Sequence, residues 1–372
     1  MAWIETTLGE VLPLKYGKNL PAAKRSHSGE FDVVTSAGVV DSHCEPFVDG
    51  SSIVIGRKGT VGSLTYCADP CWPTDTAFYT TGSDLCDLRF GYYFLQTLPL
   101  SEMNTDSAVP GLNRGEAEAL PVRIPNLETQ RAISLILRSL DDKIAANVEG
   151  VCAIDRLRNA LWDRNLSDGT TLAPLSSLAS FVNGGAFTKN ATGTGRVVVR
   201  IAEMNSGIGN NTVRNELDVP ETKIVRTGEL LFSWSGTLMT KRWPYDEAVV
   251  NQHIFKVIPD RGFPLAFLDC VIEQQLKFFR MIAAGKATTM GHIKRSDLDA
   301  HVQIPIQFRE EDLCLAESLW VNASVLEKEN ITLARTRDEL LPLLMNGKIS
   351  VREAEQEASA AGVQVPSEGS EA

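Results

Sequence analysis

The sequence has no apolar run of about 18 residues, the length that a membrane-spanning helix needs. Its opening stretch, "MAWIETTLGE", is acidic and mixed, so we expect no signal peptide there. The 7 cysteines are odd in number and irregularly spaced, which argues against a disulfide framework and favours a reducing compartment. These absences predict a cytoplasmic protein with no membrane partner.

The common motifs of catalysis are also missing. The sequence holds no Gly-x-x-x-x-Gly-Lys-Ser/Thr phosphate loop, no His-Glu-x-x-His, no Gly-x-Ser-x-Gly and no Asn/Asp-Pro-Pro-Tyr/Phe stretch. Cys67 and Cys71 have no second ligand pair nearby, so we interpret them as core thiols and not as a zinc site. We therefore expect a non-catalytic chain with no metal or cofactor of its own.

What the chain does contain is a long internal repeat. "GLNRGEAEALPVRIP" (Gly111 to Pro125) returns as "GHIKRSDLDAHVQIP" (Gly291 to Pro305), and each copy closes on Val-x-Ile-Pro. Further matches keep the same order: Arg114 with Lys294, Gly17 with Gly184, and Gly59-Thr60 with Gly236-Thr237. A period near 180 residues indicates a duplicated domain and not a solenoid.

Each copy has the pattern of a mixed α/β unit. "SSIVIG" (51–56) and "ELLFSW" (229–234) are short apolar runs before glycine-containing turns, which predicts buried strands. Residues 89–98 and 265–282 have helical periodicity instead. The fold class we expect is mixed α/β, with two similar globular domains.

A long helical pattern follows each copy of the repeat. Apolar positions recur at alternating steps of four and three, the seam of a coiled coil. The first seam is Ile133, Leu137, Leu140, Ile144, Asn147, Val151, Ile154, Arg158 and Leu161; the second is Ala316, Leu319, Ala323, Leu326, Asn330, Leu333, Arg337, Leu340 and Leu344. Helices of about 38 residues extend about 57 Å and need a partner to bury such stripes. We expect the two to pair antiparallel, giving a pseudo-twofold internal repeat.

Two asparagines interrupt the seams. Asn147 and Asn330 lie symmetrically about a point near Glu149 when the helices are superposed. One hypothesis is a buried asparagine pair that fixes the register of the two helices. The alternative, that each asparagine faces water at a helix edge, stays open from the sequence.

The order of these segments resembles the specificity subunits of type I restriction–modification systems. The resemblance lies in "IPNLETQRAISLILRSLDDKIAAN" (124–147), similar to that family's conserved region, and in "VVNQHIFKV" (249–257), similar to its target-recognition domains. One departure is that "IPIQFREEDLCLAESL" in the second copy lacks the Leu127 and Gln130 of the first. The partner-binding surface is therefore expected to differ between copies.

The resemblance implies a domain plan and a function. Target-recognition domains at 1–127 and 166–307 would each read one half of a bipartite double-stranded DNA target. Conserved helices at 128–165 and 308–349 would set the spacer and dock methyltransferase (M) subunits, expected to be two, with restriction/translocase (R) subunits completing the complex. S-adenosylmethionine, ATP and Mg²⁺ would be held by those partners. Residues 350–372 are acidic and predict a disordered tail, with a short fraying helix at most.

Charge only partly agrees with a DNA-binding protein. The formal net charge is −11; residues 1–127 carry 9 Lys+Arg against 15 Asp+Glu, whereas residues 166–307 carry 15 against 13. Most phosphate contact is then expected from the partner subunits. Two other readings stay open: a non-catalytic interaction scaffold, or a DNA mimic that uses its acidity to occupy a partner's DNA site.

Basic and amide side chains near glycine turns are the candidate DNA contacts, because the backbone can approach DNA closely there. They are Lys24, Arg25, Arg57, Lys58, Asn113 and Arg114 in the first copy, and Lys189, Ser235, Lys241, Arg242, Lys286, Thr288, His292, Lys294 and Arg295 in the second. The alternative for each is a solvated turn residue. Trp234 and Trp243 are better explained by core or turn packing than by base stacking.

Overall fold

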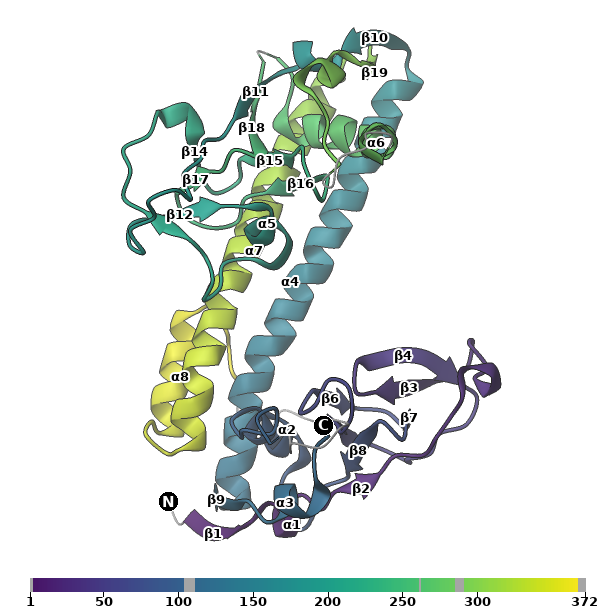
Figure 1. The fold of residues 1–372 in the computed structure, drawn as a ribbon, viewed down its shortest axis with the longest axis vertical. Coiled ribbons are helices and arrows are strands. Elements are labelled where there is room, and N and C mark those ends of the chain that lie inside the picture. Colours follow the sequence, from purple (N-terminus) through teal and green to yellow (C-terminus); the bar gives the residue numbers. More distant parts are fainter. Residues whose placement is uncertain (1–2, 104–110, 261, 285–290, 367–372) are drawn as a thin grey trace. The chain divides into compact units, whose positions relative to one another are not determined.

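The structure is a computed structural model that describes residues 3–103, 111–260, 262–284 and 291–366 (Figure 1). The chain forms two compact units: unit 1 comprises Met1–Lys143 and Leu333–Ala372, and unit 2 comprises Ile144–Thr332. Each unit therefore holds one predicted domain together with part of both long helices. The sequence instead placed its boundaries at the ends of the helices.

Unit 1 is built mainly from short strands. Its elements before the first long helix are β1 Trp3–Thr7, α1 Leu8–Val11, β2 Lys15–Tyr16, η1 Ala22–Lys24, β3 Phe31–Thr35, β4 Gly38–His43, β5 Ser52–Gly56, β6 Leu64–Cys67, β7 Cys71–Pro73, β8 Ala77–Thr80, α2 Leu88–Gln96, α3 Arg114–Glu118 and β9 Pro121–Pro125. The helix α4, Leu127–Ser167, starts here and continues into unit 2.

Unit 2 repeats this plan. Its elements are β10 Thr170–Pro174, η2 Leu175–Ser177, β11 Ala179–Asn183, β12 Arg196–Val199, α5 Ile201–Ser206, β13 Arg214–Asn215, η3 Glu221–Lys223, β14 Ile224–Val225, β15 Leu230–Ser233, β16 Met239–Arg242, β17 Ala248–Val250, β18 Ile254–Pro259, α6 Leu265–Ala284, η4 Arg295–Asp299 and β19 His301–Pro305. The helix α7, Glu310–Met345, follows and continues into unit 1, where α8, Val351–Ala360, succeeds it.

The sheets of the two units share most of their topology, although the sheet that contains the parallel pair is β4-β3-β7 in unit 1 and β13-β12-β17-β14 in unit 2. The four-stranded sheet β2-β8-β5-β6 of unit 1 corresponds strand by strand to β11-β18-β15-β16 of unit 2. A parallel pair, β3 with β7, corresponds to β12 with β17, and the outer pair β1-β9 corresponds to β10-β19. The mixed α/β duplication predicted from the repeat is therefore confirmed.

One glycine position of the repeat requires glycine for the same structural reason in both units. A Cβ on Gly17 would lie 2.1 Å from the carbonyl oxygen of Thr74, and a Cβ on Gly184 would lie 2.1 Å from that of Asn251. No other residue fits so close to a neighbouring backbone. This contact holds the edge strands β2 and β11 against the same loop of each unit.

The long helices α4 and α7 pack antiparallel within each unit. In unit 2, Asn165 of α4 donates to Asp312 of α7 at 2.7 Å, while in unit 1 Asp141 of α4 accepts from Arg337 of α7 at 2.7 Å. Rising numbers on one helix thus face falling numbers on the other. Every predicted seam position is buried or half-buried, from Ile133 to Leu161 and from Ala316 to Leu344.

The two seam asparagines meet. Asn147 is 4% exposed and donates from its Nδ2 to the Oδ1 of Asn330 at 2.9 Å and to Glu329 at 2.7 Å. Asn330 in turn donates to the carbonyl of Ile144 at 3.4 Å. The hypothesis of an asparagine pair in the seam is confirmed, and the alternative of two solvent-facing asparagines is wrong.

Gln130 explains one difference between the two copies of the helix. Its side chain is fully buried, accepts from the backbone of Asp87 at 2.8 Å, and donates to the carbonyls of Leu85 and Pro125 at 3.0 and 2.8 Å. It therefore ties the start of α4 to the start of α2. In the second copy, Arg309 precedes α7 and makes an ion pair with Asp168 at 2.6 Å instead.

The expected disordered tail is corrected over its first part. Ser350 caps α8 through a hydrogen bond that its hydroxyl accepts from the backbone of Glu353, and the Glu353 carboxylate accepts one from the backbone of Ser350 in return. Ala354 and Ala358 are fully buried, and Val363 is 5% exposed. The sequence did not predict this packed helix, because its buried face consists mainly of alanine and the rest of the segment is acidic and polar. In the part of the chain that the structure describes, no helix is long and apolar enough to cross a membrane.

Candidate nucleic-acid interface

In unit 1 the turn after β5 is fixed to the stretch that opens the repeat. Lys58 and Gly111 form an isolated antiparallel bridge, and the backbone N–H of Leu112 donates to the carbonyl of Arg57 at 2.9 Å. The segment Arg57–Lys58 and the segment Gly111–Arg114 are 50 residues or more apart in sequence. The structure thus brings four of the six candidate residues of the first copy into one place.

Unit 2 builds the same arrangement. Ser235 bridges His292, and the N–H of Ile293 donates to the carbonyl of Trp234 at 3.0 Å. Gly59 and Gly236 follow these turns with φ of +77° and +65°, a backbone conformation that favours glycine. We call this feature the pinned turn; it comprises Arg57–Gly59 with Gly111–Arg114 in unit 1, and Trp234–Gly236 with His292–Arg295 in unit 2.

The pinned turns correct the alignment of the repeat by one residue. The sequence paired Arg114 with Lys294, but Arg114 begins α3 and Arg295 begins η4. The structural counterpart of Arg114 is therefore Arg295, and that of Lys294 is Asn113, the residue before each short helix. Unit 2 has one residue fewer between this helix and the following strand. The two copies therefore return to the offset of 180 residues at Val-x-Ile-Pro.

The unit 1 candidates differ in what holds them. The Arg57 guanidinium is half-exposed, lies 5.0 Å from the Tyr16 ring centroid, and donates to the carbonyl of Asp75 at 3.3 Å. Lys58 is exposed beside it. Asn113 caps α3 by accepting from the backbone of Gly115 at 2.9 Å, so its side-chain oxygen is already used.

Arg114 and Arg25 contact neighbouring protein groups, whereas Lys24 is exposed. Arg114 makes an ion pair with Glu118 at 3.1 Å, which reduces the charge it offers to a phosphate. Lys24 is exposed in η1, whereas Arg25 donates to the carbonyl of Leu20 at 3.3 Å and lies 3.7 Å from Asp41. Lys24 and Arg25 are not part of the pinned turn.

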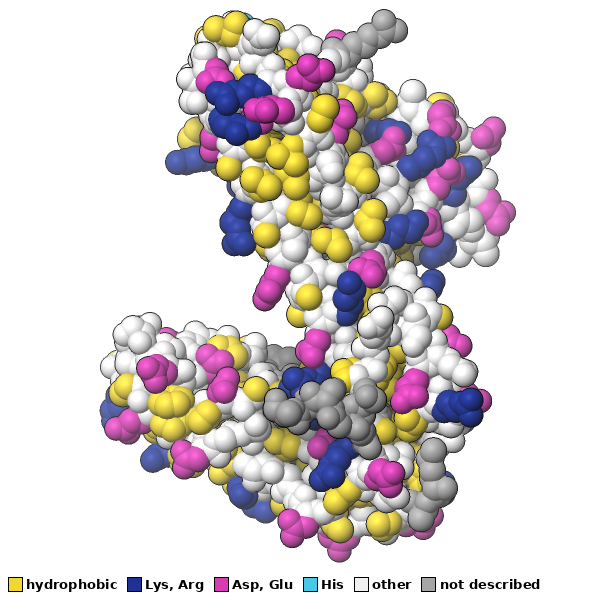
Figure 2. Space-filling view, turned by 180° about the vertical axis from the view of Figure 1, so that it is seen from behind, with side chains coloured by type: hydrophobic (Ala, Val, Ile, Leu, Met, Phe, Trp, Pro, Cys, Tyr) yellow, Lys and Arg dark blue, Asp and Glu magenta, His cyan; other side chains and the backbone are white. Residues whose placement is uncertain are grey.

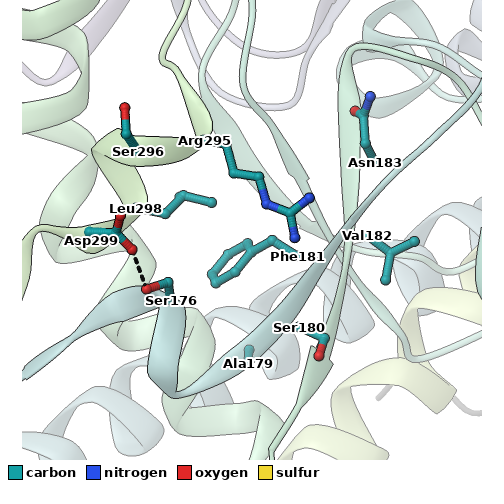
Figure 3. A pocket seen from close by; sticks show the side chains of 10 residues that line it. All are labelled: Ser176, Ala179, Ser180, Phe181, Val182, Asn183, Arg295, Ser296, Leu298 and Asp299. Carbon is teal, nitrogen blue, oxygen red and sulfur yellow. Dashed lines mark hydrogen bonds between the residues drawn. The ribbon is translucent and has the colours of Figure 1, made fainter.

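In unit 2, Lys294 and Arg295 are exposed at the pinned turn, and His292 is half-exposed 6.5 Å from the Trp234 ring. Ser235 is only 5% exposed and contributes backbone geometry more than a side chain. Figure 3 shows the Arg295 side chain extending from η4 toward β11, between Asn183 and Phe181, at the edge of a concavity of about 840 Å³. The Arg295 side chain thus projects from the pinned turn into this concavity.

The structure contradicts the expectation that Arg242 contacts DNA. It is 7% exposed, its guanidinium binds Glu327 of α7 through two hydrogen bonds of 2.8 and 3.2 Å, and it lies 4.6 Å from the Trp320 ring. Such a group anchors β16 to the long helix and has no free edge for DNA. Burial against a helix does not show in the sequence, because β16 reads as an ordinary polar turn.

The remaining candidates lie outside the pinned turn. Lys241 is half-exposed on β16, and Lys189 is exposed in the loop after β11. Lys286 and Thr288 lie outside the described residues. Trp243 is fully buried, as expected, whereas Trp234 is half-exposed beside the pinned turn and donates from its indole to Asn183 at 2.9 Å.

Three residues near the pinned turns were missed by sequence reasoning: Tyr16, Asn183 and Phe255. Each comes from a strand that pairs beside the turn, so only the sheet register brings them close. Their alignment within the repeat was the one available signal. On the face shown in Figure 2, Lys/Arg and Asp/Glu side chains are interspersed and no large basic patch appears.

Among the described residues, no group of three or more His, Cys, Asp or Glu side chains is placed to hold a metal ion. Cys67 and Cys71 are both buried in the core of unit 1. The Cys67 thiol has a raised pKa, because the hydrogen bond with Cys71 and burial both disfavour its thiolate.

Comparison with known proteins agrees with this geometry. Residues 2–149 match the family model described as the type I restriction modification DNA specificity domain. The chain is 23% identical over 159 residues to the type I restriction enzyme EcoprrI specificity subunit of Escherichia coli; that match covers 41% of this chain and 39% of the relative.

Solved structures resemble the chain over more of its length. The type I restriction–modification system S subunit from M. genitalium aligns with a TM-score of 0.66 at 14% identity, covering 92% of this chain and 96% of that one. The HsdS subunit from Thermoanaerobacter tengcongensis aligns at 14% identity over 93% and 97%, with a TM-score of only 0.33.

Two similar sheet-rich units and a pair of long antiparallel helices define the fold class, which is that of a type I restriction–modification S subunit. The resemblance noted in the sequence is confirmed: residues 2–149 match the DNA specificity domain of type I restriction–modification systems, and the chain shares the fold of a type I S subunit.

Proposed function

We propose that each unit of this chain reads one half of a bipartite double-stranded DNA target. The observation that carries the proposal is the pinned turn, built twice from the same backbone bonds, Lys58 to Gly111 and Ser235 to His292. Each turn projects polar or cationic side chains from a rigid backbone, as base recognition requires. The presence of a pinned turn in each unit is best explained by a DNA target with two parts.

The long helices support a second element of the proposal, a defined spacer between the half-sites. Both α4 and α7 are continuous through the two units, and the Asn147–Asn330 pair fixes their register. Half-site spacing on DNA reflects the geometry of the protein that reads it. The helices also offer docking surfaces for two methyltransferase subunits, with restriction/translocase subunits added to the complex.

Chemistry is then carried out by the partners. S-adenosylmethionine belongs to the methyltransferase subunits, and ATP with Mg²⁺ to the restriction subunits. The acidic balance of residues 1–127 suggests that the partners also make most phosphate contacts, so salt-dependent affinity belongs to the assembly. A DNA mimic would carry carboxylates over one face, and the positive charge balance of residues 166–307, 15 Lys+Arg against 13 Asp+Glu, argues against that reading.

The proposal is tested by sequencing the methylated genome of a host with and without this gene, in the presence of its methyltransferase subunit. We expect a bipartite methylated motif with an unspecified spacer, present only with the gene. A continuous motif, or no change in methylation, would contradict the proposal.

The spacer is tested by removing one heptad from each helix. Deleting residues 143–149 and 328–334 removes facing segments that include the Asn147–Asn330 pair, and the loss of one whole heptad from each helix keeps the remaining seam positions in phase. Each helix shortens by about 10 Å, or about three base pairs of DNA. We expect the methylated motif to keep both half-sites and change its spacer. Unchanged spacing in the shortened protein would sink the spacer role.

A further inference from the structure

The pinned turn of unit 2 opens onto a cavity of about 440 Å³. Trp234, Phe255 and His292 line it with aromatic rings, Ile293 adds an apolar wall, and Lys294 and Arg295 lie at its cationic side. This volume falls in the range of about 300–1,000 Å³ typical of small-molecule sites. The cavity lies on the frame that we propose to face DNA.

Backbone hydrogen bonds identify the same positions in unit 1. The N–H of Gly17 donates to the carbonyl of Ala77, as that of Gly184 does to Ile254, which makes the preceding residue Tyr16 the counterpart of Asn183. The residue after Ala77 is Phe78, the counterpart of Phe255. The remaining counterparts follow from the pinned turn.

Three of the positions have kept their chemistry. An aromatic ring, an aliphatic side chain and an arginine recur in both units: Phe78 and Phe255, Leu112 and Ile293, Arg114 and Arg295. The other four positions have changed: Tyr16 to Asn183, Arg57 to Trp234, Gly111 to His292, and Asn113 to Lys294. A constant frame with exchanged side chains is the pattern expected of one site adapted to two ligands.

In unit 1 the site presents hydrogen-bond donors. The guanidinium of Arg57 lies 5.0 Å from the Tyr16 centroid and 5.6 Å from that of Phe78, which holds the planar group in place. Its one described hydrogen bond, to the carbonyl of Asp75, uses Nη1. A guanidinium has five N–H donors, so several remain to meet paired acceptors such as guanine O6 and N7.

In unit 2 the site presents an apolar face. The indole N–H of Trp234 donates to Asn183 at 2.9 Å, so the side chain has no donor left for a base. Its ring lies 5.9 Å from Phe255 and 5.4 Å from His253, and it remains half-exposed. What Trp234 offers a ligand is therefore planar hydrophobic surface.

We propose that position 57 in unit 1 and position 234 in unit 2 determine base preference in the two half-sites, by different chemistry. Arg57 selects a base with two acceptors on its major-groove edge, and the Trp234 cavity selects the apolar surface of a base. This inference rests on the proposed function, because it concerns how each unit reads its half of the target. The apolar surface that the Trp234 cavity selects is either the methyl group of a thymine or the face of an unstacked base.

The test compares methylated motifs made by Arg57→Ala and Trp234→Arg, each co-expressed with the methyltransferase subunit. Arg57→Ala is expected to relax one position in one half-site, with a loss of about 5- to 150-fold in discrimination there. Trp234→Arg is expected to change one position in the other half-site only. Arg89→Ala is the matched control, since Arg89 lies 3.5 Å over the Tyr66 ring of unit 1 but outside the site; its motif should be unchanged.

Purified complexes separate the two sources in unit 2. Replacing thymine by uracil at the affected position weakens wild-type binding if the methyl group is read, and a 2-aminopurine there brightens on binding if the base is unstacked. Trp234→Phe, which keeps an aromatic face, should retain the wild-type motif. Variants that co-purify with the methyltransferase subunit but keep both half-sites unchanged, or lose all sites uniformly, overturn the inference. Failure of the proposed function looks different, because the wild-type chain would then leave no bipartite motif at all.

Discussion

Arg158 and Arg337 occupy the same place in the two copies of the long helix, yet their surroundings differ. The Arg158 side chain is 3% exposed; it binds Asp269 of α6 and donates to the carbonyl of Ala266 at 3.1 Å. The Arg337 side chain is 31% exposed and binds Asp141 of α4 at 2.7 Å. The buried Arg158 is therefore paired with a carboxylate of α6, and Arg337 is paired with a carboxylate of the facing long helix α4.

The residues that face these arginines across the helix pair are also repeat counterparts. Trp320 lies 5.5 Å from Arg158, whereas its counterpart Asp141 binds Arg337 and accepts from Tyr93 of α2 at 2.6 Å. Burial lowers the pKa of Arg158, but the charge and hydrogen bond of Asp269, together with other nearby groups that include Asp155, outweigh burial and hold that pKa above its ordinary value. The comparison teaches that duplication preserved the arginine while each unit evolved its own way of neutralising it.

Replacing each arginine by alanine should give the largest difference in stability between the two units. Arg158→Ala leaves Asp269 buried without its partner, so we expect unfolding free energy to fall by about 3–5 kcal/mol. Arg337→Ala acts on a partly exposed pair and should cost about 1 kcal/mol or less. Urea unfolding measures both values, and equal losses would refute the distinction.

Two controls accompany the arginine variants. Arg156→Ala changes an exposed arginine on the same helix and should have little effect. The double variant Arg158→Met with Asp269→Leu replaces the ion pair by apolar side chains, and should recover much of the stability lost in Arg158→Ala.

The asparagine pair offers a smaller test at the centre of the repeat. Asn147→Ala removes a side chain that is 4% exposed and leaves its partners unsatisfied, so about 1–3 kcal/mol of stability should be lost. Asn330 is half-buried, and Asn330→Ala should cost less. Unfolding in denaturant ranks the two, and a larger loss for Asn330→Ala would show that burial does not decide their contributions.

The helix α8 is the smallest asymmetry, since β10 follows α4 whereas α8 follows α7. Ser350→Ala removes the capping hydroxyl of α8 and should destabilise that helix by about 1 kcal/mol. Amide hydrogen exchange over residues 351–360 should speed up about fivefold, since 1.4 kcal/mol corresponds to tenfold. Ser359→Ala, an exposed position near the other end of α8, is the control. If both variants exchange alike, the cap does not hold the helix.

Several structural features followed from residue spacing alone. The steps of four and three from Ile133 to Leu161 predicted a buried seam because a helix brings such positions onto one face. The symmetric places of Asn147 and Asn330 made their contact one of two hypotheses, and the structure shows it at 2.9 Å. Periodicity is a local property, and for that reason a sequence reports it well.

Contacts between distant strands were out of reach. Nothing near Arg242 indicates Glu327, and nothing near Arg57 indicates Tyr16, because sheet register and packing against the long helices bring them together. The one-residue offset between Arg114 and Arg295 also required the backbone bonds of the pinned turns. Of these residues, Arg57, Arg114 and Arg295 belong to the candidate DNA interface, and the contact with Glu327 excludes Arg242 from it.

The sequence by itself determined the duplication, the mixed α/β class and the paired helices, since repeat length and hydrophobic period are written along the chain. Only the tertiary structure decided which cations are buried in ion pairs and which remain at the pinned turns. The physical reason is that a charged side chain looks the same in sequence whether it ends against a carboxylate in the interior or in water.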